Sequence, residues 1–74
     1  MSNMEFFQVP GIFKDSICRA KEEKNGVYTI SLNAVKIGSI IKENGGWRLL
    51  EQLKEELSAE NVQLIGQRID ERNH

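Results

Sequence analysis

The clearest alternation of apolar and polar positions falls in two segments, 27–32 and 35–42. A period of two is typical of strands with one buried face. A two-residue loop between the segments pairs Leu32 with Val35, and the two apolar faces then coincide, as a correct register requires. We therefore predict a β-hairpin over 27–42, with these side chains on its buried face: Tyr28, Ile30, Leu32, Val35, Ile37 and Ile41.

Segment 12–24 has two interpretations. Phe13, Ile17 and Ala20 recur at helical spacing, and the segment stops at Asn25-Gly26, a pair that suits the end of a helix. The same pair also suits a hairpin turn, which would make the segment a strand. A strand, in the register we consider, places three charged side chains on the face of Tyr28, and burying them is costly. The sequence therefore favours a helix here.

Two further helices are predicted toward the C-terminus. After the loop at 43–46, three leucines at steps of three and four indicate a helix over 47–57: Leu50, Leu53 and Leu57. In the segment 59–72, Ser58 is a good helix cap, and an apolar stripe follows it: Val62, Ile65 and Ile69. Leu64 does not fit that stripe, so a third core strand remains the alternative. We favour the helix.

The predicted fold class is therefore α+β. A small antiparallel sheet centred on 27–42 packs against two or three helices, and an edge strand or ordered arm precedes the turn at Pro10-Gly11. At 74 residues, the chain is expected to be one domain over 1–74, with flexible ends at 1–4 and 71–74.

Length and composition limit how such a domain can be stabilised. A chain this short buries only about 60% of the surface that its unfolded form exposes. Its single cysteine, Cys18, excludes an intramolecular disulfide, so a homodimer is an expected additional source of burial. No apolar run approaches membrane-span length, and no export signal precedes the first segment. With one free thiol, these features predict a cytoplasmic protein that does not enter membranes.

Reactive groups do not converge in this sequence. The only histidine, His74, is the last residue, so a nucleophilic triad is not expected. The adjacent carboxylates at 22–23, 55–56 and 70–71 lie in charged segments that we expect to be exposed, and nothing in the sequence indicates the burial that acid–base catalysis requires. Neither the spacing of metal ligands nor a phosphate-binding glycine loop is present. We expect no enzyme activity, no metal and no cofactor.

Surplus apolar side chains indicate a surface for another protein. In the predicted register Ile40 falls on the polar face of the hairpin, and Phe6 and Phe7 cannot both face one small core if their segment is extended. Trp47 begins a predicted helix directly after two glycines. Contiguous exposed apolar groups mark interaction sites, and aromatic side chains favour interfaces. These four residues are therefore our candidates for contact with a protein partner.

The alternative function is weak nucleic-acid binding. Lys36 and Lys42 lie on the polar face of the predicted hairpin, Arg48 follows it, and Trp47 offers a ring for stacking a base. A phosphate-tracking surface usually makes the whole domain basic, however, and this chain carries a net charge of −1. The sequence thus predicts a small non-catalytic protein-binding module, an adaptor, inhibitor or regulatory accessory protein that also binds itself. The sequence does not identify its partner.

Overall fold

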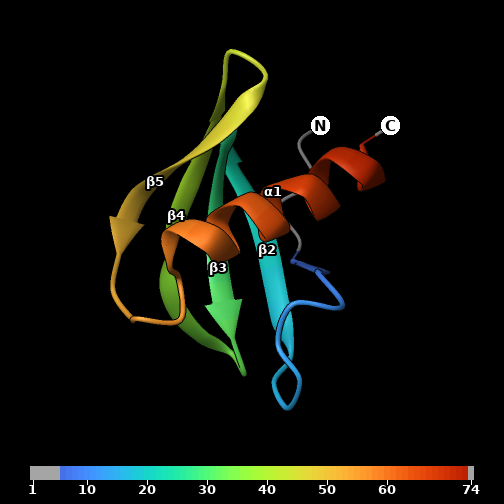
Figure 1. The fold of residues 1–74 in the computed structure, drawn as a ribbon, viewed down its shortest axis with the longest axis vertical. Helices are drawn as coiled ribbons and strands as arrows, with labels where there is room; N and C mark the ends of the chain where they lie inside the picture. Colours follow the sequence, from blue (N-terminus) through green and yellow to red (C-terminus); the bar gives the residue numbers. More distant parts are fainter. Residues whose placement is uncertain (1–5, 74) are drawn as a thin grey trace.

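The computed structural model describes residues 6–73 and shows a two-layer α+β fold (Figure 1). Neighbouring strands of the five-stranded sheet are antiparallel and follow the chain in the order β1-β2-β3-β4-β5. No helix of this described part is long and apolar enough to span a membrane. The elements are β1 (Phe7–Gln8), β2 (Cys18–Lys24), β3 (Val27–Leu32), β4 (Val35–Glu43), β5 (Gly46–Gln52) and α1 (Ala59–Arg72).

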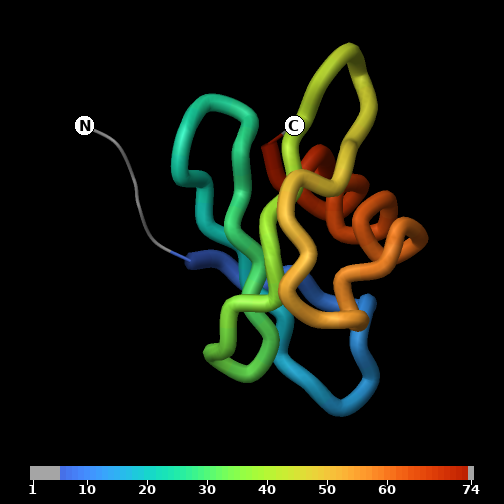
Figure 2. The backbone as a smooth tube through the Cα atoms, turned by 90° about the vertical axis from the view of Figure 1, so that its left-hand side faces the viewer, coloured from blue at the N-terminus to red at the C-terminus, as the bar shows by residue number. Residues whose placement is uncertain are grey.

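The two layers of the fold differ in size, because a single helix packs against a five-stranded sheet. Helix α1 crosses one face of the sheet diagonally (Figure 1), and the view from the side shows the helix on that side only (Figure 2). Within residues 6–73, no other helix covers the sheet, so the prediction of two or three helices is wrong. The core lies between α1 and the sheet and consists of eleven buried residues: Val9, Cys18, Ala20, Tyr28, Ile30, Ile37, Ile40, Leu57, Val62, Ile65 and Ile69.

The predicted hairpin over 27–42 is present, but its register shifts by one residue. Leu32 pairs with Val35 across a two-residue turn, as predicted. A β-bulge follows, after which Ile30 pairs with Gly38 and Tyr28 pairs with Ile40. A shift of one residue exchanges the two faces of a strand. The prediction that Ile40 lies on the polar face is therefore wrong.

Glycine at position 38 allows the sheet and the following loop to approach closely at the bulge. A Cβ atom on Gly38 would lie 2.2 Å from the carbonyl oxygen of Glu51 and 2.5 Å from the Leu57 side chain. Its φ of +151° also lies in a region that side chains rarely adopt. The absence of a side chain here lets Leu57 reach full burial against β4.

The helix predicted over 12–24 is instead a loop and strand β2, and the prediction is wrong for a reason of register. Cys18 pairs with Leu32, and Ala20 pairs with Ile30, so these two small residues face the core. Arg19 and Lys21 alternate with them and therefore lie on the sheet face that α1 leaves uncovered. These charged side chains are therefore not buried in the core, so the energetic cost that disfavoured a strand is absent.

The helix predicted over 47–57 is also wrong. Asn44 and Gly45, with φ of 52° and 79°, form a tight turn that returns the chain as β5. A second bulge, at Leu50, interrupts the pairing of β5 with β4. Leu50 is 47% exposed, whereas Leu57 is fully buried beyond the end of the strand. The leucines that were expected to form one stripe therefore have different environments.

The C-terminal helix agrees with the sequence. Ser58 caps α1, and its hydroxyl oxygen accepts a hydrogen bond from the backbone N–H of Asn61 at 3.2 Å. The predicted stripe of Val62, Ile65 and Ile69 is buried, so the helix is confirmed over the alternative strand. Of the ends expected to be flexible, 1–4 and His74 lie outside the described residues, and the helix itself continues to Arg72.

The contact between α1 and β5 leads to a prediction about Gly66. A Cβ atom at this position would lie 2.2 Å from Cγ of Trp47. Gly66→Ala improves helix propensity by about 1 kcal/mol but forces the helix and the ring apart. We expect a net loss of about 2 kcal/mol in the free energy of unfolding, measured by urea denaturation.

Two variants check the cause. Gln67→Ala changes the adjacent exposed position of the same helix and should leave stability within about 0.5 kcal/mol of the native chain. Gly66→Ala combined with Trp47→Leu should lose less stability than the two single changes added together, because the smaller side chain makes room for the methyl group. An additive double variant would contradict this account.

Candidate functional site

The four residues predicted to contact a protein do not form one surface. Phe6 is 46% exposed at the edge of the sheet, where the Lys21 ammonium lies 5.5 Å from the centre of its ring. Ile40 is fully buried beneath α1 and presents no surface to a partner in this structure. Phe7 and Trp47 are half-buried and pack toward the core.

Phe7 and Trp47 are part of an aromatic row that fastens α1 to the sheet. Both rings pack edge to face on Tyr28, with centroid distances of 6.3 Å and 5.5 Å. The Arg72 guanidinium lies 4.1 Å from the centre of the Phe7 ring, and the Lys42 ammonium lies 5.2 Å from that of Trp47. These contacts occupy the ring faces within the chain, which indicates a structural role for the row.

The carboxylate of Asp70 joins this row to the end of α1. It accepts hydrogen bonds from the Lys42 ammonium and, at 3.1 Å, from Nε1 of Trp47. The hydrogen bond from Lys42 is the main reason that the pKa of Asp70 lies below its ordinary value of 3.8, and the Trp47 bond acts in the same direction. A hollow of about 330 Å³ lies beside this cluster, but the polar groups of the cluster already bind one another.

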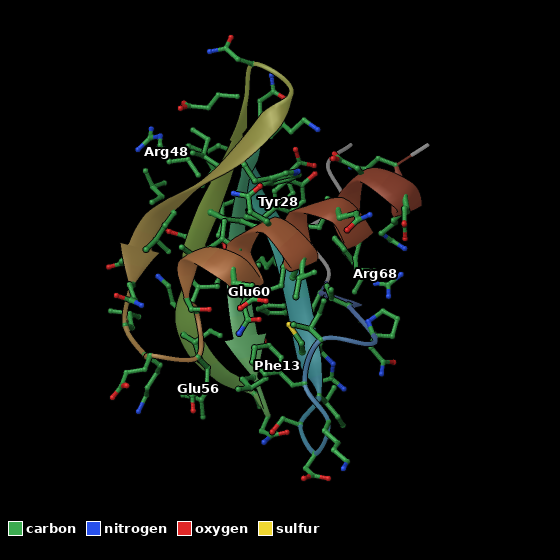
Figure 3. All side chains as sticks on the ribbon, in the orientation of Figure 1. Phe13, Tyr28, Arg48, Glu56, Glu60 and Arg68 are labelled. Carbon is green, nitrogen blue, oxygen red and sulfur yellow. The ribbon has the colours of Figure 1, made fainter. Side chains whose placement is uncertain are left out.

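The residues predicted to bind nucleic acid are also separated. Lys36 forms an ion pair with Glu51, and Arg48 forms one with Glu43 at 2.7 Å. Figure 3 shows Arg48 outside β5, away from the helix. The β4 bulge turns Lys42 to the opposite, helix-covered side, where its ammonium binds Asp70. The chain's own carboxylates therefore neutralise all three cations, and no shared basic surface results.

Catalytic chemistry finds little support in the described residues. Residues 6–73 contain no group of three His, Cys, Asp or Glu side chains that converge as metal ligands. The Cys18 thiol is 2% exposed, and burial raises its pKa to about 11. A buried thiol with such a pKa is almost entirely protonated at neutral pH, so it is a poor nucleophile.

The largest concentration of exposed apolar side chains lies at the end of the sheet where β2 and β4 begin. Val35 is 52% exposed, Ile17 is 47% exposed and Leu53 is 51% exposed, which accounts for half of the six exposed large hydrophobic residues in the described chain. We call these three residues, with the hollow that Val35 lines, the apolar end. The side chains of Phe13 and Glu56 mark the same end of the molecule in Figure 3.

Hydrogen bonds join the segments that carry Ile17 and Leu53 to the hairpin that carries Val35. The Asn33 N–H donates to the carbonyl oxygen of Ile17 at 2.9 Å, and the Asn33 side chain accepts from the Ile17 N–H at 2.9 Å. On the other side, the Leu53 N–H donates to the carbonyl oxygen of Ile37 at 2.9 Å. Both neighbouring segments are therefore fixed to the hairpin next to Val35, so the apolar end is preorganised.

A hollow of about 270 Å³ lies within the apolar end. Leu32, Val35 and Ile37 form its apolar part, while Ser16, Asn33, Lys54 and Glu56 supply polar groups around them. An apolar centre with a polar border is the usual anatomy of a protein-binding surface. The apolar end can accept an apolar side chain, and nothing in its composition indicates bond-making chemistry.

The chain matches no protein-family model, no curated protein and no solved structure, so its function has to be argued from this geometry. The sequence reasoning missed the apolar end because it assigned Ile17 and Leu53 to buried helical stripes and Val35 to the buried sheet face. The two Asn-Gly pairs, at 25–26 and 44–45, were the signals that could have identified the flanking segments as strands.

The burial of Cys18 leads to a prediction about its reactivity. Because its thiol is buried and its pKa is raised, it should react with a thiol-specific dye at pH 8 at least 100-fold more slowly in the native chain than in urea. A time course of absorbance with Ellman's reagent measures both rates. Comparable rates would show that Cys18 is accessible in solution.

A further prediction concerns Asp70, whose pKa is lower in the folded chain than in the unfolded chain. Its contribution to stability is therefore fully present above pH 3.8 and is lost as the pH falls through the folded-state pKa. Asp70→Asn should cost about 0.5–1 kcal/mol at pH 7, a small value because the pair is partly exposed. The stabilities of the two proteins should converge as the pH falls below the folded-state pKa of Asp70, measured by urea denaturation followed through Trp47 fluorescence.

A double-mutant cycle identifies the partner in this interaction. Lys42→Met should destabilise the native chain more than it destabilises the Asp70→Asn variant, because the ion pair is already absent there. Equal costs in the two backgrounds would attribute the pH dependence to other groups.

Proposed function

We propose that this chain is a small, non-catalytic protein-binding module that contacts its partner through the apolar end. The observation that carries the proposal is the hollow lined by Val35, which is about half exposed, together with Leu32 and Ile37. Ile17 and Leu53, each also about half exposed, lie on the segments that hydrogen bonds join to the same hairpin. Each exposed apolar side chain has an unfavourable hydration free energy wherever it lies, but only neighbouring side chains can be covered by one partner. Gathered in one place, they gain free energy when a partner covers them.

The rest of the described chain offers less to a partner. The sheet face opposite α1 has small hydroxyl side chains at its centre, Thr29, Ser31 and Ser39, next to long charged ones such as Lys21 and Glu51. The three hydroxyl side chains are themselves buried, so the centre of this face presents little apolar area to a partner. The outer edge of β5 is interrupted by the Leu50 bulge, and bulges discourage the addition of another strand.

The ion pairs within the chain favour a protein partner over nucleic acid. Binding through shape and apolar contact fits a regulatory or adaptor role, and we place that role in the cytoplasm, as expected from the sequence. Nucleic acid is the weaker candidate as a partner, because Lys36, Lys42 and Arg48 are each paired with a carboxylate of the chain. Within residues 6–73, no observation favours a catalytic role.

Photo-crosslinking in the cells that make this chain tests the proposal. We would replace Val35 with p-benzoylphenylalanine, which reacts on irradiation with whatever covers it. The matched control is the same replacement at Leu64, an exposed apolar residue on the outer side of α1. We expect one or a few discrete protein adducts from position 35 and none of the same mass from position 64.

Circular dichroism of both substituted chains confirms that they fold before the comparison is made. Identical adduct patterns from the two positions, or no protein adduct from position 35, would overturn the proposal that the apolar end is the contact surface.

A further inference from the structure

We propose that this chain binds a phosphate group in a hollow between β1 and the C-terminal part of α1. The inference goes beyond the proposed function and does not depend on it, because this hollow shares no lining residue with the hollow of the apolar end. Its volume is about 300 Å³. We call it the edge hollow, and its lining includes Phe7, Gln8, Pro10, Arg68, Glu71 and Arg72.

Two arginines of α1 meet at the edge hollow. Arg68 and Arg72 are four residues apart, so they lie one turn apart on the same side of the helix. The Arg68 guanidinium lies beside Gly11, where a Cβ atom would be 3.0 Å from its Nη2, and Figure 3 shows Arg68 near the turn that follows β1. The Arg72 guanidinium lies over the Phe7 ring. Contacts with β1 and its turn therefore hold both guanidiniums at the hollow.

The charges at the edge hollow are not balanced within the described chain. Glu71 forms an ion pair with Arg68 at 3.2 Å. None of the four ion pairs within residues 6–73 includes Arg72. Two like charges at this spacing repel each other, and one carboxylate compensates for only one of them. An anion in contact with both guanidiniums removes the remaining repulsion and forms charge-assisted hydrogen bonds with them.

The backbone of β1 offers the same anion another donor. The Val9 N–H donates to the carbonyl oxygen of Cys18 at 2.8 Å and therefore points toward β2. Successive residues of a strand point their N–H groups to opposite sides, so the Gln8 N–H points away from β2. On that side β1 has no neighbouring strand in the described sheet. A ligand in the edge hollow can therefore accept a hydrogen bond from the Gln8 N–H.

This donor set fits a phosphate group better than a carboxylate. A phosphate ester carries about 1.5 to 2 negative charges at neutral pH and has three strong acceptor oxygens. It can therefore serve both guanidiniums and the Gln8 N–H at once. A carboxylate has two oxygens and one charge, which Glu71 already supplies. Phe7 and Pro10 give the hollow an apolar part, on which the organic part of an ester can lie.

Titration of the ¹⁵N-labelled chain with inorganic phosphate, followed by NMR at constant ionic strength, tests the inference. We expect saturable shifts of the Gln8 amide and of the side-chain Nε–H signals of Arg68 and Arg72. The dissociation constant should be on the order of 1–10 mM, because exposed charge contacts are individually weak. Acetate should bind at least about 5-fold more weakly, because it has fewer oxygens and less charge.

Phenyl phosphate distinguishes the two sources of the phosphate group. Binding about 3-fold tighter than that of inorganic phosphate would identify an ester whose organic part contacts Phe7 and Pro10. Equal binding of the two compounds would identify the free ion.

Arginine variants test the location of the site. Arg68→Gln and Arg72→Gln should each weaken phosphate binding at least about 5-fold, because each removes one charged donor. Arg48→Gln is the matched control, since it makes the same change in net charge at an exposed arginine of β5. It should leave the dissociation constant within about 2-fold of the native value, because Arg48 lies outside the edge hollow.

A change in the opposite direction guards against loss of binding through misfolding. Glu71→Gln should tighten phosphate binding about 3-fold, because it releases Arg68 and removes a like charge from the ligand's surroundings. Glu51→Gln, which removes the same charge from the ion pair with Lys36, should have no such effect.

Three results would overturn the inference. The first is the absence of a saturable shift at Gln8, Arg68 and Arg72 up to about 50 mM phosphate, well above the expected dissociation constant. The second is acetate binding as tight as that of phosphate. The third is an equal effect of each variant and its control, which would attribute the binding to net charge alone.

Discussion

The approach of α1 to the sheet depends on the contact between Gly66 and the Trp47 ring. The indole occupies the space that a side chain at position 66 would need, so the helix lies as close to β5 as its backbone permits. From this position, Nε1 of Trp47 donates to Asp70 one turn further along the helix, and Asp70 also binds Lys42 on β4. One close contact thus sets the distance, the orientation and the electrostatic partners of the only helix in the described chain.

A single helix cannot cover a five-stranded sheet. It buries one face, and the bulges in β4 and β5 determine which side chains that face receives. The uncovered face has small polar residues at its centre, with long charged side chains next to them. The apolar end is different, because Val35 and Leu53 lie beyond the reach of α1 and neither is shielded by a neighbouring element. The exposure of these side chains therefore follows from the ratio of one short helix to five strands.

The sequence predicted part of this fold well. The alternation over 27–42 identified the central hairpin, and Ser58 with the stripe that follows it identified α1. The prediction failed at 12–24 and 47–57, where a few apolar residues at steps of three or four were taken as helical stripes. In such short segments, residues of a strand, of a turn and of the segment that follows can fall at helical spacing by chance. Leu50, Leu53 and Leu57 do so. The apolar end was missed together with these two segments, because Ile17, Val35 and Leu53 were assigned to the predicted core.

By itself, the sequence determined the features that arise from local preferences: the tight turns at asparagine and glycine, the cap at Ser58, and the strand-forming character of 27–42. Tertiary structure alone decided which face each residue occupies after a bulge. One extra residue in β4 moved Ile40 into the core and Lys42 to Asp70. Strand period constrains only the alternation of faces, whereas the choice between the two faces depends on pairing and packing with residues far along the chain. For that reason the apolar end emerges only from the folded molecule.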